Sequence, residues 1–329
     1  MTKPKILITR RVPQEALDLL APHFELDHHD KAVAISRKDL LRRVRGKDGV
    51  LCLLTEKIDP ELLKAGAALK AVSTFSVGFD HIDIPACTAR GIPVTNTPGV
   101  LTETTADFTW ALLMSIARRV VEGDRMMRKS AYKGWDPLML LGTDVFGKTL
   151  GVVGFGRIGQ AVARRALGFG MRVLYHDVGR VAPEREEELK AEFVELSFLL
   201  KNSDFITLHT VLDAATRHLI DEKAFGLMKR SAYLINAARG PIVDEKALVK
   251  ALKAERIRGA ALDVYEWEPK TAPGLNKQWN AVLAPHLASA SLETRTKMGI
   301  MAAEGLRDVL ALHMRPSYLV NPDVYSVVR

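Results

Sequence analysis

The sequence has few cysteines, few aromatic residues and no long apolar run. Cys52 and Cys87 are its only cysteines and neither belongs to a C-x-x-C pair, so the sequence indicates neither a disulfide framework nor a thiolate zinc site. No stretch approaches the roughly 18 apolar residues of a membrane span, and the first apolar run is too short for a signal-peptide core. We expect a cytoplasmic protein without a bound metal or a membrane partner.

Charge is also not concentrated in one place. Lys and Arg number 47 against 39 Asp and Glu, for a formal net charge of +8. The basic residues are scattered, and aromatic residues make up only 6% of the chain, so we expect no nucleic-acid partner. Solubility and attraction of small anionic substrates are sufficient explanations of the positive charge.

The length of 329 residues, with 47% hydrophobic and 26% charged residues, predicts about two globular domains. Internal repeats, low-complexity tracts and Pro/Ser-rich linkers are missing. Short apolar runs instead alternate with helical patterns along the chain, which predicts parallel sheets covered by helices.

A glycine-rich motif at 149–177 organises this pattern. Apolar residues 150–153 predict a buried strand, residues 158–167 have helical apolar spacing, and Gly154, Gly156 and Gly159 lie at the turn between them. In such a motif the first glycine permits the turn, the second lets backbone approach a pyrophosphate, and the third lets helix and strand pack closely. The helix N-terminus then offers N–H groups to the phosphates. The stretch predicts a dinucleotide-binding fold.

The next predicted strand, 172–176, ends in Asp177, about 20 residues beyond the motif, where a ribose-binding acid is expected. A carboxylate accepts hydrogen bonds from a free 2′-hydroxyl and repels a 2′-phosphate, so NAD(H) is favoured over NADP(H). Arg180 and Arg185 follow closely and could soften this discrimination, so NADP(H) stays possible. The alternative is that both are solvated surface charges.

Other elements follow from the same patterns. Two longer helices are predicted, one over 102–121 as a bridge between domains and one over 291–313 after the last strand. If the last helix packs on the N-terminal part, the nucleotide domain is an insertion. The remaining strands are predicted at 6–9, 50–54, 69–73, 94–95, 204–208, 233–236, 260–264 and 281–283, and the remaining helices at 14–20, 39–45, from 60, up to 89, 183–190 and 244–254. Ser36 precedes the helix at 39–45, and Asp59 is the predicted N-cap of the helix that begins at Pro60.

Three polar residues follow strands of the second sheet, where ligands of parallel sheets bind. They are Arg239, Glu268 and His286. Arg can hold a carboxylate with a planar fork of donors, His can exchange a proton near neutral pH, and Glu can orient that His. Together they suit reduction of a 2-oxo acid by hydride from a nicotinamide. Singly, each could be a salt-bridge, surface or loop residue.

Four motifs in this order resemble the D-isomer-specific 2-hydroxyacid dehydrogenase family: G-F-G-R-I-G, N-A-A-R-G-P-I-V-D, A-L-D-V-Y-E-W-E-P and A-P-H-L-A-S-A-S. The stretches G-V-L-C-L-L-T-E-K-I-D, S-T-F-S-V-G-F-D-H-I-D and W-D-P-L are similar to its glyoxylate/hydroxypyruvate reductase branch. The resemblance implies an α/β fold with a Rossmann-type NAD-binding domain, 100–286, inserted into a flavodoxin-like substrate-binding domain, 1–99 and 287–329. It also implies a homodimer.

The resemblance further implies that Arg239, Glu268 and His286 are catalytic and that the substrate is glyoxylate or hydroxypyruvate. The backbone of Val77 and Gly78 would bind the substrate carboxylate, and Trp135 would reach a neighbouring subunit's site. The implied cofactor-binding residues are Thr105, Gly154, Gly156, Arg157, Ile158, Gly159, Asp177, Ala237 and Asp263.

Several of these residues have an alternative role. Gly78 could be a plain turn glycine, Thr105 a residue of the first helical turn, Asp263 a loop-capping carboxylate and Trp135 a core residue. Val211 departs from the family, which usually has Pro there, so the adenine-side wall could differ from that of relatives.

Some relatives in the branch lack an acid at the position of Asp177 and use NADP(H), so the branch resemblance and Asp177 favour different cofactors.

Three alternatives to the reductase function remain open. Within the family the enzyme could be a phosphoglycerate dehydrogenase, which usually carries a further regulatory domain, or a D-lactate dehydrogenase. Outside enzymes, a dinucleotide-sensing corepressor uses the same fold, with a peptide-binding cleft and disordered tails.

Overall fold

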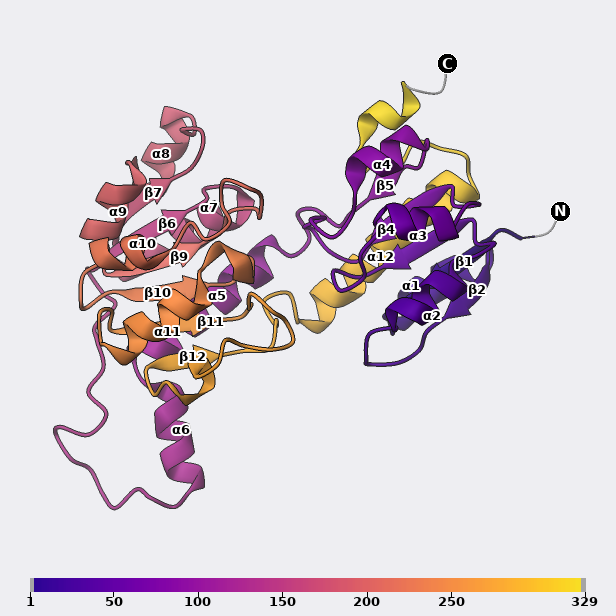
Figure 1. Ribbon diagram of the computed structural model, residues 1–329. Helices are drawn as coiled ribbons and strands as arrows, with labels where there is room; N and C mark the ends of the chain where they lie inside the picture. Colours follow the sequence, from indigo (N-terminus) through magenta and orange to yellow (C-terminus); the bar gives the residue numbers. More distant parts are fainter. Residues whose placement is uncertain (1–2, 327–329) are drawn as a thin grey trace. The chain divides into compact units, whose positions relative to one another are not determined.

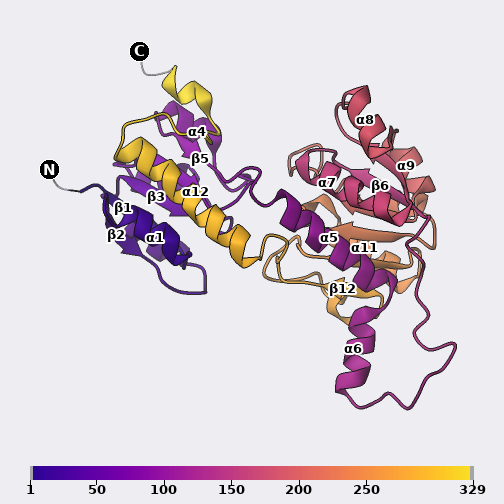
Figure 2. The ribbon, with the colours of Figure 1, turned by 180° about the vertical axis from the view of Figure 1, so that it is seen from behind.

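The computed structural model describes residues 3–326 (Figures 1 and 2). The chain divides into two compact units: unit 1 comprises Met1–Leu101 and Ala290–Arg329, and unit 2 comprises Thr102–Ser289. Each unit is built on one parallel sheet with helices packed against it. Within the described range, no helix has the length and apolar character needed to cross a membrane.

Unit 1 has a five-stranded sheet in the order β2-β1-β3-β4-β5, with all neighbours parallel. The three central strands are almost entirely buried, as expected for a sheet covered on both faces. β2, which the sequence does not predict, is a half-exposed edge strand of mixed polarity. The strands are β1 (Lys5–Ile8), β2 (Glu25–His28), β3 (Gly49–Cys52), β4 (Ala71–Thr74) and β5 (Val94–Thr95).

Two helices of unit 1 begin directly after Ser36 and Asp59, the residues that precede them in the prediction. The Ser36 hydroxyl accepts a hydrogen bond from Asp39 N at 3.1 Å, and the Asp59 carboxylate accepts one from Leu62 N at 3.0 Å. The helix behind Ser36 starts two residues earlier than the predicted 39–45, because the cap sets its start. The helices are α1 (Gln14–Leu20), α2 (Arg37–Arg43), α3 (Pro60–Ala65), α4 (Ile84–Ala89) and α12 (Leu292–Leu310).

The last helix returns to unit 1. α12 packs against α1, β3 and β4, and Ser73 Oγ donates to the carbonyl of Ala302 at 2.8 Å. Figure 2 shows α12 lying along this sheet. Because α12 follows every strand of unit 2 in the chain, unit 2 is an insertion into unit 1, which confirms the predicted fold class.

Unit 2 has a seven-stranded parallel sheet in the order β12-β11-β10-β9-β6-β7-β8, larger than the first as predicted. The strand order reverses after β6, next to which β9 and β7 lie on opposite sides. The strands are β6 (Thr149–Val153), β7 (Arg172–His176), β8 (Ala191–Phe193), β9 (Phe205–Leu208), β10 (Tyr233–Asn236), β11 (Gly259–Leu262) and β12 (Ala281–Leu283).

Helices cover both faces of this sheet (Figure 1). The sequence does not predict α9 and α10, which are short. The helices are α5 (Thr102–Ala117), α6 (Val120–Arg128), α7 (Arg157–Ala166), α8 (Pro183–Leu189), α9 (Leu196–Asn202), α10 (Glu222–Leu227) and α11 (Glu245–Lys253). Short 3₁₀ turns occur at Leu167–Phe169, Gly240–Ile242, Leu275–Lys277 and, in unit 1, Pro322–Tyr325.

The prediction of a single helix over 102–121 is wrong. α5 ends at Ala117, and Arg119 takes a left-handed backbone conformation, φ 56°, before α6 begins. The returning chain at Thr143 donates its N–H to the carbonyl of Ala117 at 2.8 Å, which satisfies the end of α5. This break comes from a tertiary contact, so the local sequence, which lacks Gly and Pro here, contains no signal for it.

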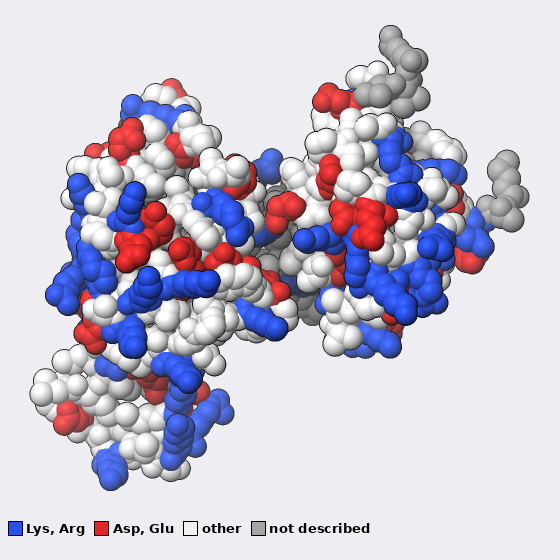
Figure 3. Space-filling model, in the orientation of Figure 1, with Lys and Arg blue, Asp and Glu red and all other residues white. Residues whose placement is uncertain are grey.

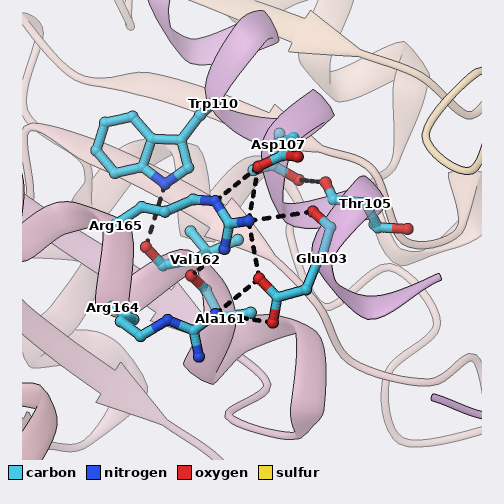
Figure 4. A network of polar contacts seen from close by, with 9 residues as sticks. Glu103, Thr105, Asp107, Trp110, Ala161, Val162, Arg164 and Arg165 are labelled. Atoms are coloured by element: carbon cyan, nitrogen blue, oxygen red, sulfur yellow. Dashed lines mark hydrogen bonds and ion pairs between the residues drawn. The ribbon is translucent and has the colours of Figure 1, made fainter. Parts of the chain in front are cut away.

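Polar contacts join α5 to α7 (Figure 4). Arg164 of α7 binds the Glu103 carboxylate at 2.7 Å, and Arg165 binds Asp107 at 2.6 Å. The indole N–H of Trp110 donates to the carbonyl of Val162 at 3.1 Å. The predicted bridging helix is therefore packed into unit 2, where it supports the helix that follows the glycine motif.

Candidate active site

The glycine motif has the geometry that each predicted role requires. A β-carbon on Gly154, which has φ +88°, would lie 2.5 Å from the backbone of His209, and one on Gly159 would lie 2.2 Å from the carbonyl oxygen of Gly154. Gly156, the N-cap of α7, has open space around its missing β-carbon. Exposed Arg157 and half-buried Ile158 begin the helix. The close packing, the open backbone and the helix N-terminus fit a pyrophosphate.

Asp177 lies at the rim of this motif. Its Oδ2 accepts a hydrogen bond from Phe155 N at 2.5 Å, and its Oδ1 accepts one from Val178 N at 2.7 Å. Phe155 stands between the first two glycines, so the carboxylate is tied directly to the turn that would hold the phosphates. The position fits the ribose of a bound dinucleotide.

His286 and Glu268 form a hydrogen-bonded pair. Nδ1 of His286 is 3.0 Å from Oε2 of Glu268, and the two side chains are 26% and 30% exposed. Burial disfavours ionisation of Glu268, but the His286 hydrogen bond and charge, the Tyr265 amide and Arg239 outweigh it and lower its pKa. An ionised carboxylate accepts from Nδ1–H and leaves Nε2 as the nitrogen that can exchange a proton.

The backbone of His286 is held in an uncommon conformation. Its φ is 58°, in the left-handed region, and its N–H donates to the carbonyl of Asp263 at 2.8 Å. The Asp263 carboxylate, 0% exposed, accepts from Leu287 N at 2.6 Å and Ala288 N at 2.8 Å. Burial raises the pKa of Asp263. Its carboxylate therefore caps the loop that presents His286, the alternative role considered above.

Arg239 lies in the loop after β10, together with Ala237. The side chain of Asn236 shapes this loop, since its Nδ2 donates to the carbonyl of Arg239 at 2.9 Å and its Oδ1 accepts from Ala238 N at 3.0 Å. A β-carbon on Gly240 would lie 1.9 Å from the carbonyl carbon of Tyr265. The loops after β10 and β11 therefore touch, and the Arg239 charge acts on Glu268.

A buried acid, Glu245, supports the Glu268 loop. Its carboxylate accepts hydrogen bonds from Glu266 N and, at 2.8 Å, from Ala272 N. Burial raises the pKa of Glu245. Within the loop, Tyr265 N donates to Oε1 of Glu268 at 3.0 Å. Sequence reasoning missed Glu245 because an acid in the first turn of a helix normally needs no further explanation.

In unit 1, Val77 and Gly78 lie in the loop after β4. Asn96 Nδ2 donates to the Val77 carbonyl at 2.7 Å, and Ser76 Oγ donates to the Gly78 carbonyl at 2.7 Å. Because a peptide group is planar and trans, fixing a carbonyl directs the N–H of the following residue the opposite way. Asn96 and Ser76, both buried, thus orient the amides of Gly78 and Phe79. Neither residue is predicted from the sequence.

The remaining predicted residues are scattered. Thr105 is buried in the first turn of α5, where its carbonyl accepts from Thr109 Oγ1 at 2.8 Å. Trp135 is 80% exposed, so its alternative role as a core residue is wrong. Val211 is exposed beyond β9. Residues 3–326 contain no group of three or more His, Cys, Asp or Glu side chains arranged to hold a metal ion.

The chain is similar to known proteins over nearly its whole length. Residues 110–288 match the model of the D-isomer specific 2-hydroxyacid dehydrogenase NAD-binding domain. A glyoxylate reductase of Korarchaeum cryptofilum is 50% identical over 327 residues, covering 99% of this chain and 98% of the relative.

Two solved structures are similar over nearly the whole chain. The TT0316 protein of Thermus thermophilus has a TM-score of 0.89 and 44% identity, covering 96% of this chain and 99% of that one. The NADPH-dependent glyoxylate/hydroxypyruvate reductase of Sinorhizobium meliloti, solved with NADP and malonate, has a TM-score of 0.85 and 30% identity, covering 97% of each. The chain belongs to the D-isomer specific 2-hydroxyacid dehydrogenase family and is an oxidoreductase that uses a nicotinamide dinucleotide.

Proposed function

We propose that this protein reduces a small 2-oxo acid, glyoxylate or hydroxypyruvate, to the D-2-hydroxy acid. The observation that carries the proposal is the His286–Glu268 pair, with Arg239 acting on it, in the same unit as a glycine motif built for a dinucleotide. The glyoxylate reductase relative at 50% identity supports the substrate class.

The proposed reaction divides the chemistry between cofactor and protein. The reduced nicotinamide supplies a hydride for C2 of the substrate. His286, protonated and oriented by Glu268, gives a proton from Nε2 to the new alkoxide. Arg239 holds the substrate carboxylate and polarises the ketone with its fork of donors. In the reverse direction, neutral His286 removes the hydroxyl proton.

Backbone groups of unit 1 are proposed as further substrate contacts. The amides of Val77 and Gly78 would bind the substrate carboxylate, and the Gly78 amide belongs to the peptide whose carbonyl Asn96 holds. Thr105, Ala237 and Asp263 would border the cofactor, Asp263 through the loop it caps. We also propose that residues 100–286 form the domain that binds the dinucleotide and that residues 1–99 and 287–329 form the domain that binds the substrate.

We propose NAD(H) as the preferred cofactor, with NADP(H) possible. Asp177 places a negative charge beside the predicted ribose site, which favours a free 2′-hydroxyl. The Sinorhizobium relative is NADPH-dependent, so Asp177 is the residue to test. Asp177→Ala should weaken the preference for NADH over NADPH, and an unchanged ratio of the two dissociation constants would remove Asp177 from the ribose role.

We also propose a homodimer. The segment after α6 exposes several large apolar side chains, which a second subunit would cover. Figure 3 shows this segment, at the lower left, as mostly uncharged surface. The exposed members are Tyr132, Trp135, Leu138, Leu141 and Phe146. Sedimentation velocity of the wild type and of Trp135→Ala tests the assembly, and a wild type that sediments as a monomer contradicts it.

For location and partners, we propose the cytoplasm and no nucleic-acid or membrane partner. Both cysteines are buried and unpaired, which suits a reducing compartment. On the face in Figure 3, acidic and basic side chains are interspersed over both units. Such mixing produces no extended field of one sign that would attract a polyanion.

The decisive experiment is NADH oxidation with a panel of 2-oxo acids, followed by chiral analysis of the products. We expect turnover of glyoxylate and hydroxypyruvate, with the D isomer as product from hydroxypyruvate. A better rate with pyruvate would indicate a D-lactate dehydrogenase. Tight NADH binding with turnover at background for the whole panel would indicate the non-enzymatic sensor.

A further inference from the structure

Arg180 lies three residues beyond Asp177, in the loop after β7. In dinucleotide-binding folds, an Arg near this position accommodates the 2′-phosphate of NADP. Here Arg180 is engaged elsewhere: its Nε and Nη2 bind the two carboxylate oxygens of Glu186 at 2.9 and 2.7 Å. This is a bidentate arrangement, which is directional as well as charge-assisted. The guanidinium is therefore directed to the first turns of α8.

Glu186 is fixed by more than this ion pair. Its side chain is only 11% exposed, and the Tyr175 hydroxyl donates to its Oε1 at 2.6 Å. The Arg180 guanidinium and the Tyr175 hydroxyl hold the pKa of Glu186 at about 2. Glu186 therefore carries a negative charge at neutral pH.

The same contacts reach the glycine motif. Tyr175 is fully buried, and its ring stacks on Phe155 with 4.0 Å between ring centroids. Its hydroxyl also accepts from Val181 N at 3.1 Å, which closes the 177–181 loop onto β7. Tyr175, which binds the Glu186 carboxylate, therefore also packs against the glycine motif of the predicted cofactor site.

We propose that Glu186 is a positioning residue that holds Arg180 away from the 2′ position of the bound ribose and thereby raises selectivity for NAD(H). This inference rests on the proposed function, which places that ribose beside Asp177. Asp177 and Glu186 then act by different means: Asp177 repels a 2′-phosphate, and Glu186 withholds the cation that would neutralise it. Selectivity is obtained by disfavouring the competing ligand.

The test measures dissociation constants for NADH and NADPH by nicotinamide fluorescence. Glu186→Gln keeps the size of the side chain and an acceptor for Tyr175 but removes the charge. In an Asp177→Ala background, we expect it to tighten NADPH binding about tenfold, the value of one charge-assisted hydrogen bond, and to leave NADH binding unchanged. The gain should vanish when Arg180→Ala is added and should weaken at high salt.

Glu187→Gln is the matched control. Glu187 is also an acid of α8 and is exposed, so its variant removes the same charge without releasing Arg180. An equal NADPH gain in Glu187→Gln, or a gain that persists without Arg180, would show a general charge effect and overturn the proposal. A folded Glu186→Gln variant without any gain would overturn it as well.

A second variant covers failure to fold. Should Glu186→Gln not fold, Tyr175→Phe removes one of the contacts that fix Glu186, and a smaller gain that depends on Arg180 is expected; its absence overturns the proposal. Failure of the proposed function is separate. It would appear in the wild type, as no glyoxylate reduction or no NADH binding.

Discussion

The two units of this protein build their candidate binding groups from different materials. At the carboxyl edge of the unit 2 sheet, the candidate groups are ionisable side chains, His286, Glu268 and Arg239. In unit 1, the loop after β4 offers backbone amides, and Asn96 fixes the peptide that carries the Gly78 amide. Side-chain groups can be removed by one substitution, whereas a backbone amide can be altered only through the residues that hold it.

Removing His286 should have the largest effect in this comparison. His286→Ala deletes the proposed proton donor, and we expect kcat for glyoxylate reduction to fall by about a thousandfold, within the range for general acid catalysis. NADH binding, followed by fluorescence, should persist because the glycine motif is intact. Loss of NADH binding in the same variant would instead indicate a disturbed fold of unit 2.

Arg239→Lys should come next. A point charge replaces a planar fork, so we expect kcat/KM to fall about a hundredfold while the charge near Glu268 is retained. Steady-state kinetics with glyoxylate measure the loss. Activity close to that of the wild type would exclude Arg239 as the carboxylate clamp.

Glu268→Gln should have a smaller effect. We expect kcat/KM for glyoxylate to fall about thirtyfold because His286 loses the carboxylate that is hydrogen-bonded to its Nδ1 and orients the ring. Steady-state kinetics measure the loss, and activity close to that of the wild type would exclude Glu268 as the orienting residue.

The same variant makes a prediction about stability. The folded-state pKa of Glu268 lies below its ordinary value of 4.5, so the carboxylate stabilises the folded chain above pH 4.5. That contribution is lost as the pH falls through the lowered value. The difference in melting temperature between wild type and Glu268→Gln should therefore shrink on acidification below pH 4.5.

Asn96→Ala tests the backbone side of the comparison and should have the smallest effect. Loss of one buried hydrogen bond that orients the Gly78 amide should raise KM for glyoxylate about tenfold and leave kcat nearly unchanged. Asn321→Ala is the control, because Asn321 is equally buried in unit 1 but binds Val94 N, the Thr88 hydroxyl and the Ile92 carbonyl. A rise in KM in both variants would indicate a general loss of stability.

The sequence predicted the elements whose signals are local. The glycine motif, the buried strands and the caps at Ser36 and Asp59 all depend on residues next to one another, and the structure contains them where expected. The edge strands β2 and β8 were missed because short, half-exposed strands lack an apolar run. The end of α5 depends on the distant Thr143.

The candidate site shows the same division. Arg239, Glu268 and His286 are visible in the sequence because their residue types are chemically distinctive. Asn236 was missed because it stabilises its own loop by binding the Arg239 carbonyl, and Glu245 because it stabilises a loop that is distant in sequence. Asn is common at strand ends and Glu in first helical turns, so only the structure shows which loops they stabilise.

The contact at Gly240 has a consequence for engineering. Its α-carbon lies so close to the peptide of Tyr265 that no side chain of any size can stand there. The loop after β10, which carries Arg239, and the loop after β11, which carries Glu268, therefore have complementary shapes. A chimera that takes one of these loops from another dehydrogenase should take the other loop from the same enzyme.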